Sequence, residues 1–316
     1  MPTGSRILFV TTLLVALALA GAAGAAERTA AFAHADPGVR AGAMGGAFTA
    51  LGEQPIALYW NPAGLYFQDR RYLEASYSSL YGLGLAKRTF LTVGFKRQIE
   101  LPAFDGNRVV VNKDSETGAA YAVGMESLSL DLEENGYSEV AVSGAAAWGY
   151  GGRFVLGISA RALFVSSDLE DVSANGYDFG LGVIWRMSDR ERVAIAAPHL
   201  ISRVFWSFDS TERLPFSVTA GWARYWNPNL VTTADLEFRE GEDSPYRLAA
   251  GAEWWVFPTR LTLRAGYRYL QGGVENVGAP TFGAGVKFGP MVVDYAFRME
   301  PGDLNDTHRI GLVTGF

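Results

Sequence analysis

The sequence offers little material for catalysis or for metal binding. It contains no cysteine, and its three histidines, His34, His199 and His308, stand far apart. None has a second histidine or a group of carboxylates at the spacing of a zinc or calcium site, so we expect no metal and no cofactor. A hydrolase would need a serine and an acid beside a histidine, and Ser202 and Asp209 near His199 form only a loose version of that pattern. We therefore predict that the protein is not an enzyme.

The chemistry that the sequence does offer is electrostatic. Charged residues recur at every second position of segments that are otherwise apolar, as where Arg264 and Arg268 alternate with Leu263 and Tyr267. Because buried charges must be paired, we favour an interior held together by ion pairs, with a substrate path lined by the same side chains as the alternative. The residues predicted to face this interior are Arg153, Arg161, Asp178, Arg186, Asp235, Glu237, Arg239, Arg247, Glu253, Arg264, Arg268, Lys287, Asp294 and Arg298.

The elements that must position these charges are β-strands. Fourteen segments alternate apolar residues with polar or small ones, the period of two that indicates a strand. They are residues 72–80, 87–97, 118–130, 138–150, 153–165, 177–187, 192–199, 214–225, 229–239, 246–256, 260–270, 281–289, 291–299 and 307–316. From the fourth segment onward, very short connections alternate with longer polar ones, which is typical of a transmembrane barrel. Residues 98–117 interrupt this pattern on the side of the short turns, and we have no interpretation of them.

Alternation alone does not distinguish a soluble barrel from one that faces lipid. Aromatic residues such as Trp148 and Trp254 lie near segment ends, as in interfacial girdles, and a tilted strand of ten residues spans roughly 25 Å, the height of the lipid band. Glycines such as Gly182 and Gly266 are frequent on the charged face, which suits an interior crowded by other chain segments. We predict an all-β fold, a transmembrane antiparallel β-barrel of about 14 strands with a short N-terminal helical plug. Its apolar faces point outward and Arg264 points inward.

The composition and the N-terminus agree with export to a membrane. Only 19% of the residues are charged and the net charge is −6, so we expect no nucleic-acid partner. Residues 1–26 have Arg6, an apolar run over 7–20 and a small-residue segment over 21–26, the pattern of a signal peptide. That apolar run is too short for a spanning helix. The expected localisation is the bacterial outer membrane, with membrane lipid as the first partner.

The segment of residues 27–71 differs from the rest and is the predicted plug. Met44, Phe48 and Leu51 have the spacing of a short amphipathic helix from 44 to 51, which Gly45 and Gly46 weaken. A second apolar turn over 56–60 is followed by a corner at the Asn-Pro-Ala-Gly sequence of residues 61–64. The predicted plug or gate residues are Gly45, Gly46, Phe48, Tyr59, Trp60, Asn61, Pro62, Ala63 and Gly64.

Within this segment, GAMGGAFTALGEQPIALYWNPAGL resembles the N-terminal signature of the FadL-like outer-membrane protein superfamily, and more closely that of its PorV/PorQ branch. The resemblance implies a barrel of fourteen strands closed by a plug. It also implies that the corner at Asn61, Pro62 and Ala63 gates the movement of hydrophobic ligands, although a corner that only anchors the plug is an equal alternative. The last residues, 309–316, resemble the recognition strand of outer-membrane proteins, with Phe316 at the end and Thr314 as a departure. They imply the barrel-assembly machinery as a partner.

Two functions follow from the resemblance. The first is passive uptake of hydrophobic small molecules. The second is a role as a PorV/PorQ-like component of a type IX protein secretion or surface-attachment system, which would bind secretion-system proteins. The stretch of residues 200–208 is apolar and aromatic, and we predict it as an outer loop that binds the hydrophobic ligand or the partner. The residues concerned are Leu200, Ile201, Val204, Phe205, Trp206 and Phe208.

Overall fold

The computed structural model describes residues 27–28, 31–32, 36–82, 84, 86–98, 102–105, 108–111, 118–132, 135–150, 153–168, 172–240, 246–257, 260–271, 277–300 and 306–316. The expected signal peptide, residues 1–26, lies outside the described residues. So does His34.

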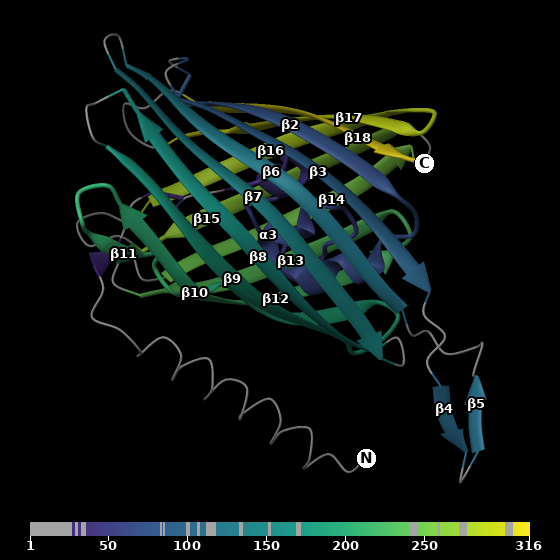
Figure 1. The fold of residues 1–316 in the computed structure, drawn as a ribbon. Coiled ribbons are helices and arrows are strands. Elements are labelled where there is room, and N and C mark those ends of the chain that lie inside the picture. Colours follow the sequence, from purple (N-terminus) through teal and green to yellow (C-terminus); the bar gives the residue numbers. More distant parts are fainter. Residues whose placement is uncertain are drawn as a thin grey trace.

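Fourteen strands form a closed antiparallel barrel, which confirms the predicted fold class (Figure 1). Each strand pairs with its neighbours in the barrel, and β18 pairs with β2 to close the ring, so the wall has no free edge strand. The barrel strands are β2 (Tyr72–Leu80), β3 (Ala86–Gln98), β6 (Gly118–Leu132), β7 (Asn135–Tyr150), β8 (Phe154–Ser167), β9 (Ser173–Arg186), β10 (Glu191–Trp206), β12 (Ser217–Asn227), β13 (Leu230–Arg239), β14 (Tyr246–Phe257), β15 (Leu261–Leu270), β16 (Val277–Phe288), β17 (Met291–Arg298) and β18 (Thr307–Gly315).

Four further strands add to this wall or stand outside it. The short strands β1 (Glu27–Arg28) and β11 (Thr211–Arg213) pair with one another, and β11 also pairs with the end of β10. The strands β4 (Pro102–Asp105) and β5 (Arg108–Val111) form a separate hairpin in the 98–117 segment. This hairpin projects beyond the ends of β3 and β6, on the side of the short turns (Figure 1).

The two faces of the wall differ as the sequence predicts. In β15, Leu263 and Tyr267 are 41% and 50% exposed on the outer face, whereas Arg264 is 7% exposed on the inner face. The same division holds in β13, where Leu236 and Phe238 point outward while Asp235 and Glu237 are buried. The barrel therefore presents apolar side chains to its surroundings and encloses charges. No helix within the described ranges has the length and the apolar character needed to cross a bilayer.

The plug lies inside the barrel as three short helical segments, α2 (Val39–Ala43), α3 (Ala57–Trp60) and the 3₁₀ helix η1 (Pro62–Phe67). The prediction of a helix from 44 to 51 is wrong. The helix ends at Ala43, because Gly45 and Gly46 take positive φ angles of 70° and 82°, which turn the chain out of the helix. A side chain at Gly45 would also strike the backbone of Tyr267, so glycine is needed here for close approach to the wall.

The predicted outer loop over residues 200–208 is also wrong for most of its length. β10 continues to Trp206, paired with β9 through Ile201↔Phe179 and Trp206↔Ala174. The register shifts between Ala197 and Ile201, so the strand contains a bulge there. Pro198 lacks the N–H that a regular ladder needs, and a bulge is one of the places where a sheet accommodates proline.

Candidate functional site

The candidate site is the interior of the barrel, where the plug meets the wall. Arg40 of α2 forms two hydrogen bonds with Glu253 of β14, at 2.8 and 2.6 Å, and a longer ion pair with Glu53 at 3.2 Å. Glu253 also accepts from Arg264 at 2.5 Å, and Arg264 reaches Asp294 of β17 at 2.5 Å. Three wall strands and the plug are thus joined by one buried chain of alternating charges. Each member has a partner of opposite sign, which is the condition for keeping charges away from water.

A second cluster fixes the residue that precedes the plug helix. The carboxylate of Asp36 is surrounded by four arginines at 2.5, 2.9, 3.5 and 3.8 Å, namely Arg268, Arg298, Arg247 and Arg309. Burial alone would raise the pKa of Asp36, but these guanidinium groups outweigh burial and hold the pKa well below its ordinary value. Asp36 therefore stays ionised and ties the start of the plug to four strands.

The plug backbone is held by wall side chains as well. Asp235 of β13 accepts hydrogen bonds from the N–H groups of Phe48 and Thr49 at 2.9 and 3.0 Å and from the Thr49 hydroxyl at 2.7 Å. Thr281 of β16 accepts from the Gly45 N–H and donates to the Ala43 carbonyl, both at 2.9 Å. These bonds satisfy peptide groups that the interrupted helix leaves free.

The corner at residues 61–64 packs tightly against two glycines of the wall. Asn61 donates to the Thr49 carbonyl at 2.9 Å and accepts from the Ala63 N–H at 3.0 Å. A Cβ atom at Gly182 would overlap Asn61, and one at Gly157 would overlap the backbone at Pro62 and Ala63. Glycine on the inner face of β8 and β9 is therefore what lets the corner touch the wall. This packing favours the anchoring interpretation of the corner over the gating one.

The structure brings most of the predicted inward charges together. Eight are buried inside the barrel, and four more lie half-buried on the inner face. Arg153 and Lys287 are exposed, because they stand at the strand ends on the short-turn rim, where the inner face opens outward. The buried eight are Arg161, Asp178, Asp235, Glu237, Arg247, Glu253, Arg264 and Asp294, and the half-buried four are Arg186, Arg239, Arg268 and Arg298.

The predicted plug residues all lie inside the barrel, but they have different surroundings. Phe48 and Trp60 pack together with ring centroids 6.3 Å apart, and the Trp60 N–H donates to the Pro37 carbonyl at 3.0 Å. Tyr59 and Trp60 line a cavity beside the plug, whereas Asn61, Pro62 and Ala63 do not. Gly46 lies against Trp60 and Arg268, and Gly64 packs against Gly52 within the plug.

That cavity adjoins a gap in the wall. β10 pairs with β12 only from Glu191↔Arg224 to Ala196↔Thr219, and its later residues bond to β9 and β11 instead. The cavity holds about 50 Å³ and is lined from the β10 side by Pro198 and His199 and from the β12 side by Pro215 and Ser217. Neither proline can donate a ladder hydrogen bond, so the β10–β12 ladder stops here, and the Leu214 N–H bonds to the Ser202 hydroxyl of β10 at 2.9 Å instead.

The gap is covered by apolar side chains. Ala197 and Phe216 are buried there, with Leu181, Leu200 and Val218 packed against them. Phe216 precedes β12 directly and stands beside the seam. Of the residues predicted as a ligand loop, Leu200 belongs to this cover, Val204 is buried, and Ile201, Phe205 and Phe208 are exposed. Trp206 stacks on Phe208 with centroids 5.4 Å apart.

Sequence reasoning missed the role of His199, which is the last residue of the predicted strand over 192–199. His199 Nδ1 lies 3.1 Å from an Asp178 oxygen and 2.8 Å from an Arg161 nitrogen, inside the barrel. The proline before it was the signal that could have revealed the bulge. His308, by contrast, lies on the outer face, where it pairs with Tyr295 at 2.7 Å. Within the described residues, no group of His, Cys, Asp and Glu side chains is arranged to hold a metal ion.

The fold has clear structural relatives. The toluene transporter TodX of Pseudomonas putida superposes with a TM-score of 0.60 at 13% identity, covering 89% of this chain and 98% of that one. The toluene transporter TbuX of Ralstonia pickettii gives 0.51 at 16% identity, covering 89% and 98%. At these identities the likeness is one of fold. No protein-family model matches the sequence, and no curated protein matches it.

The buried charge chain predicts a large effect for one arginine. Arg264→Ala leaves Glu253 and Asp294 short of a partner, and it should lower the free energy of unfolding by about 3–5 kcal/mol, the usual cost of breaking a buried pair. Arg224→Ala removes a partly exposed pair with Glu191 and should cost about 0–1 kcal/mol. Urea unfolding followed by tryptophan fluorescence measures both. Equal losses for the two variants would contradict the assigned role of Arg264.

The corner's packing predicts that the plug loosens when the wall glycine is replaced. Gly157→Ala places a methyl on the Pro62–Ala63 backbone, so the amides of η1 should exchange hydrogen at least about tenfold faster. Gly144→Ala is the matched control, since a Cβ there meets no atom within 4 Å. Hydrogen exchange by mass spectrometry reads out both, and unchanged protection in Gly157→Ala would rule out a tightly fitted corner.

Proposed function

We propose that the chain is a bacterial outer-membrane barrel of the FadL type that takes up small hydrophobic molecules passively. The observation that carries this proposal is the seam between β10 and β12, beside which the cavity next to the plug lies. A hydrophobic molecule dissolved in lipid would meet an apolar cover at that seam and a tryptophan and a tyrosine behind it. No covalent step is needed for such movement.

The outward apolar face supports placement in a bilayer. Exposing an apolar belt to water is unfavourable, whereas the same belt is stable in contact with lipid. In a closed barrel the strands also pair with one another, so no unpaired backbone N–H or C=O group faces the bilayer. Residues 1–26 would direct export, and the C-terminal strand would be recognised by the barrel-assembly machinery. Phe316 stands at the short-turn end, 67% exposed, with its N–H bonded to the Arg71 carbonyl at 3.0 Å.

The passage is closed in this conformation. Ligand pockets usually measure about 300–1,000 Å³, so a cavity of about 50 Å³ is too small for an aromatic hydrocarbon. The wall must therefore change shape when a molecule passes. Phe216 is the side chain to move, because it belongs to the small cluster that seals the seam and, among the described residues, its backbone bonds only toward β13, where its carbonyl accepts from the Glu240 N–H at 2.9 Å.

The plug itself is held too firmly to leave the barrel. Ion pairs to Arg40 and Asp36, the cap from Asp235 and the glycine contacts at Asn61 all join it to different strands. Movement past Tyr59 and Trp60, beside a stationary plug, is consequently the route we propose. Gating then resides in the cover of the seam, and the Asn61 corner serves as the anchor.

The structural relatives support uptake as the function class. Those proteins are transporters of toluene, and this chain would handle an apolar small molecule of related size. The finer assignment to the PorV/PorQ branch rests on the plug segment of the sequence alone. No described feature favours the alternative role in protein secretion.

Bilayer placement predicts a depth-dependent cost for arginine on the outer face. Val142→Arg, in the middle of β7 and so of the belt, should lower the free energy of unfolding in lipid vesicles by about 2–4 kcal/mol, whereas Phe257→Arg, at the short-turn end of β14, should cost about 0–1 kcal/mol. Both side chains are exposed on the same side of the wall. Equal and small losses at the two positions would show that the belt does not face lipid.

The uptake proposal predicts faster passage when the cover is thinned. Phe216→Ala should raise the initial rate of radiolabelled toluene uptake into expressing cells several-fold, about threefold or more, because the seam loses its largest sealing side chain. Phe282→Ala, on the outer wall away from the seam, is the matched control and should leave the rate unchanged. A rate that is identical in the Phe216→Ala variant and in cells lacking the protein would overturn the proposal.

A further inference from the structure

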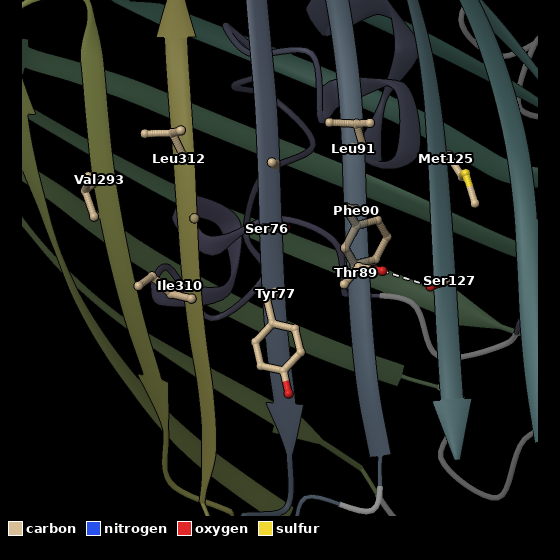
Figure 2. A pocket seen from close by; sticks show the side chains of 12 residues that line it. Ser76, Tyr77, Thr89, Phe90, Leu91, Met125, Ser127, Val293, Ile310 and Leu312 are labelled. Carbon is tan, nitrogen blue, oxygen red and sulfur yellow. Dashed lines mark hydrogen bonds between the residues drawn. The ribbon is translucent and has the colours of Figure 1, made fainter. Parts of the chain in front are cut away.

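An apolar groove lies on the outer wall, across β17, β18, β2, β3 and β6 (Figure 2). It is separate from the seam, since β2 and β10 lie on roughly opposite sides of the barrel. Its volume is about 520 Å³, which falls within the range of about 300–1,000 Å³ found for ligand sites. The groove therefore has room for a ligand that the closed interior cavity lacks.

The groove exists because one outward side chain is small. Ala75 stands directly between Leu312 of β18 and Leu91 of β3, which are 39% and 49% exposed. The two leucines form raised sides with the alanine methyl between them. Figure 2 shows Ile310 and Val293 continuing one side and Met125 continuing the other.

The lining contains almost no polar group that an occupant would have to hydrogen-bond. Two of its outward hydroxyls, those of Thr89 and Ser127, form a hydrogen bond of 2.8 Å with one another (Figure 2). The sides on either side of Ala75 are aliphatic, and Tyr77, the next outward residue of β2, is 41% exposed in the lining (Figure 2). A flexible saturated chain fits such a lining better than a peptide, which would bring unpaired backbone groups into an apolar site.

The loop end of the groove differs in character. The next outward row of side chains beyond Thr89 lies about 6.6 Å further along the strands. It consists of Ser79 of β2, Lys87 of β3 and Ser129 of β6, which are paired neighbours across the three strands. The Lys87 ammonium and the two hydroxyls are suited to an anionic phosphate group. Charge at the end and hydrocarbon along the length match an anionic membrane lipid.

We propose that this groove binds one acyl chain of an anionic phosphate-bearing lipid, with the phosphate beside Lys87 and the chain lying over Ala75. The proposal rests on the bilayer placement argued above and is independent of uptake. The site would hold a lipid in place on the wall while the seam on the far side remains free. A second copy of the chain is the competing occupant.

The test uses the purified full-length protein and native mass spectrometry. Phosphatidylglycerol and phosphatidylcholine with the same acyl chains are titrated in turn. Wild type should retain phosphatidylglycerol, and Ala75→Leu, which fills the groove, should lower the lipid-bound fraction about tenfold. Ala162→Leu is the matched control, because Ala162 lies in the same outward row as Ala75, reached through Leu91, Met125 and Val142, and it is exposed away from the groove.

The variant Lys87→Gln tests the contribution of the lipid head group separately from that of the acyl chain. This variant should still retain lipid but bind phosphatidylglycerol and phosphatidylcholine equally. Equal lipid retention in wild type and Ala75→Leu would overturn the proposal, as would a dimer mass that Ala75→Leu abolishes. Each variant is first shown to be folded by its heat-dependent shift in electrophoretic mobility. Toluene uptake by Ala75→Leu should equal that of wild type, so a failure of the uptake proposal would be seen separately.

Discussion

The pairing of charges inside a closed wall is the constraint on which the structure depends. Arg264 is buried between Glu253 and Asp294, while Glu253 also binds Arg40 of the plug. If the plug were withdrawn, Glu253 would lose one of its two cations, and Asp36 would leave four arginines facing one another. The barrel and the plug therefore stabilise each other, and neither interior surface would be stable alone.

This constraint explains why the strand register is so well defined. Sliding a strand by one residue would bring its arginine to the outer face and its leucines to the inner one. Both changes are unfavourable when the outside is apolar. The alternation of apolar and polar residues therefore indicates which residues face outward and which face inward. It was sufficient to predict the fourteen strands and the burial of residues such as Asp178 and Arg264.

The features that the sequence did not predict are determined by contacts between residues far apart in the sequence, and local sequence patterns do not reveal such contacts. The helix expected from 44 to 51 fails because Gly45 and Gly46 meet the backbone and side chains of β15, a contact between residues more than two hundred positions apart. The extension of β10 beyond its bulge was hidden because Pro198 interrupts the alternation and shifts its phase. His199 then points inward toward Asp178, a partner on a different strand that no short motif would connect to it.

The same reasoning indicates where the wall can open. Thirteen of the fourteen neighbouring strand pairs continue along most of their length, whereas β10 and β12 separate after Ala196↔Thr219. Hydrogen bonds are what make a sheet stiff, so a barrel with one short ladder deforms first at that ladder. The plug is bonded to β13, β14 and β16 and, through Glu53 and Arg192, to the start of β10, so it braces the wall on both sides of the seam at the short-turn end of β10. Motion is thus left to the part of β10 beyond its bulge and to the segment that carries Phe216, which is where the uptake proposal requires the wall to open.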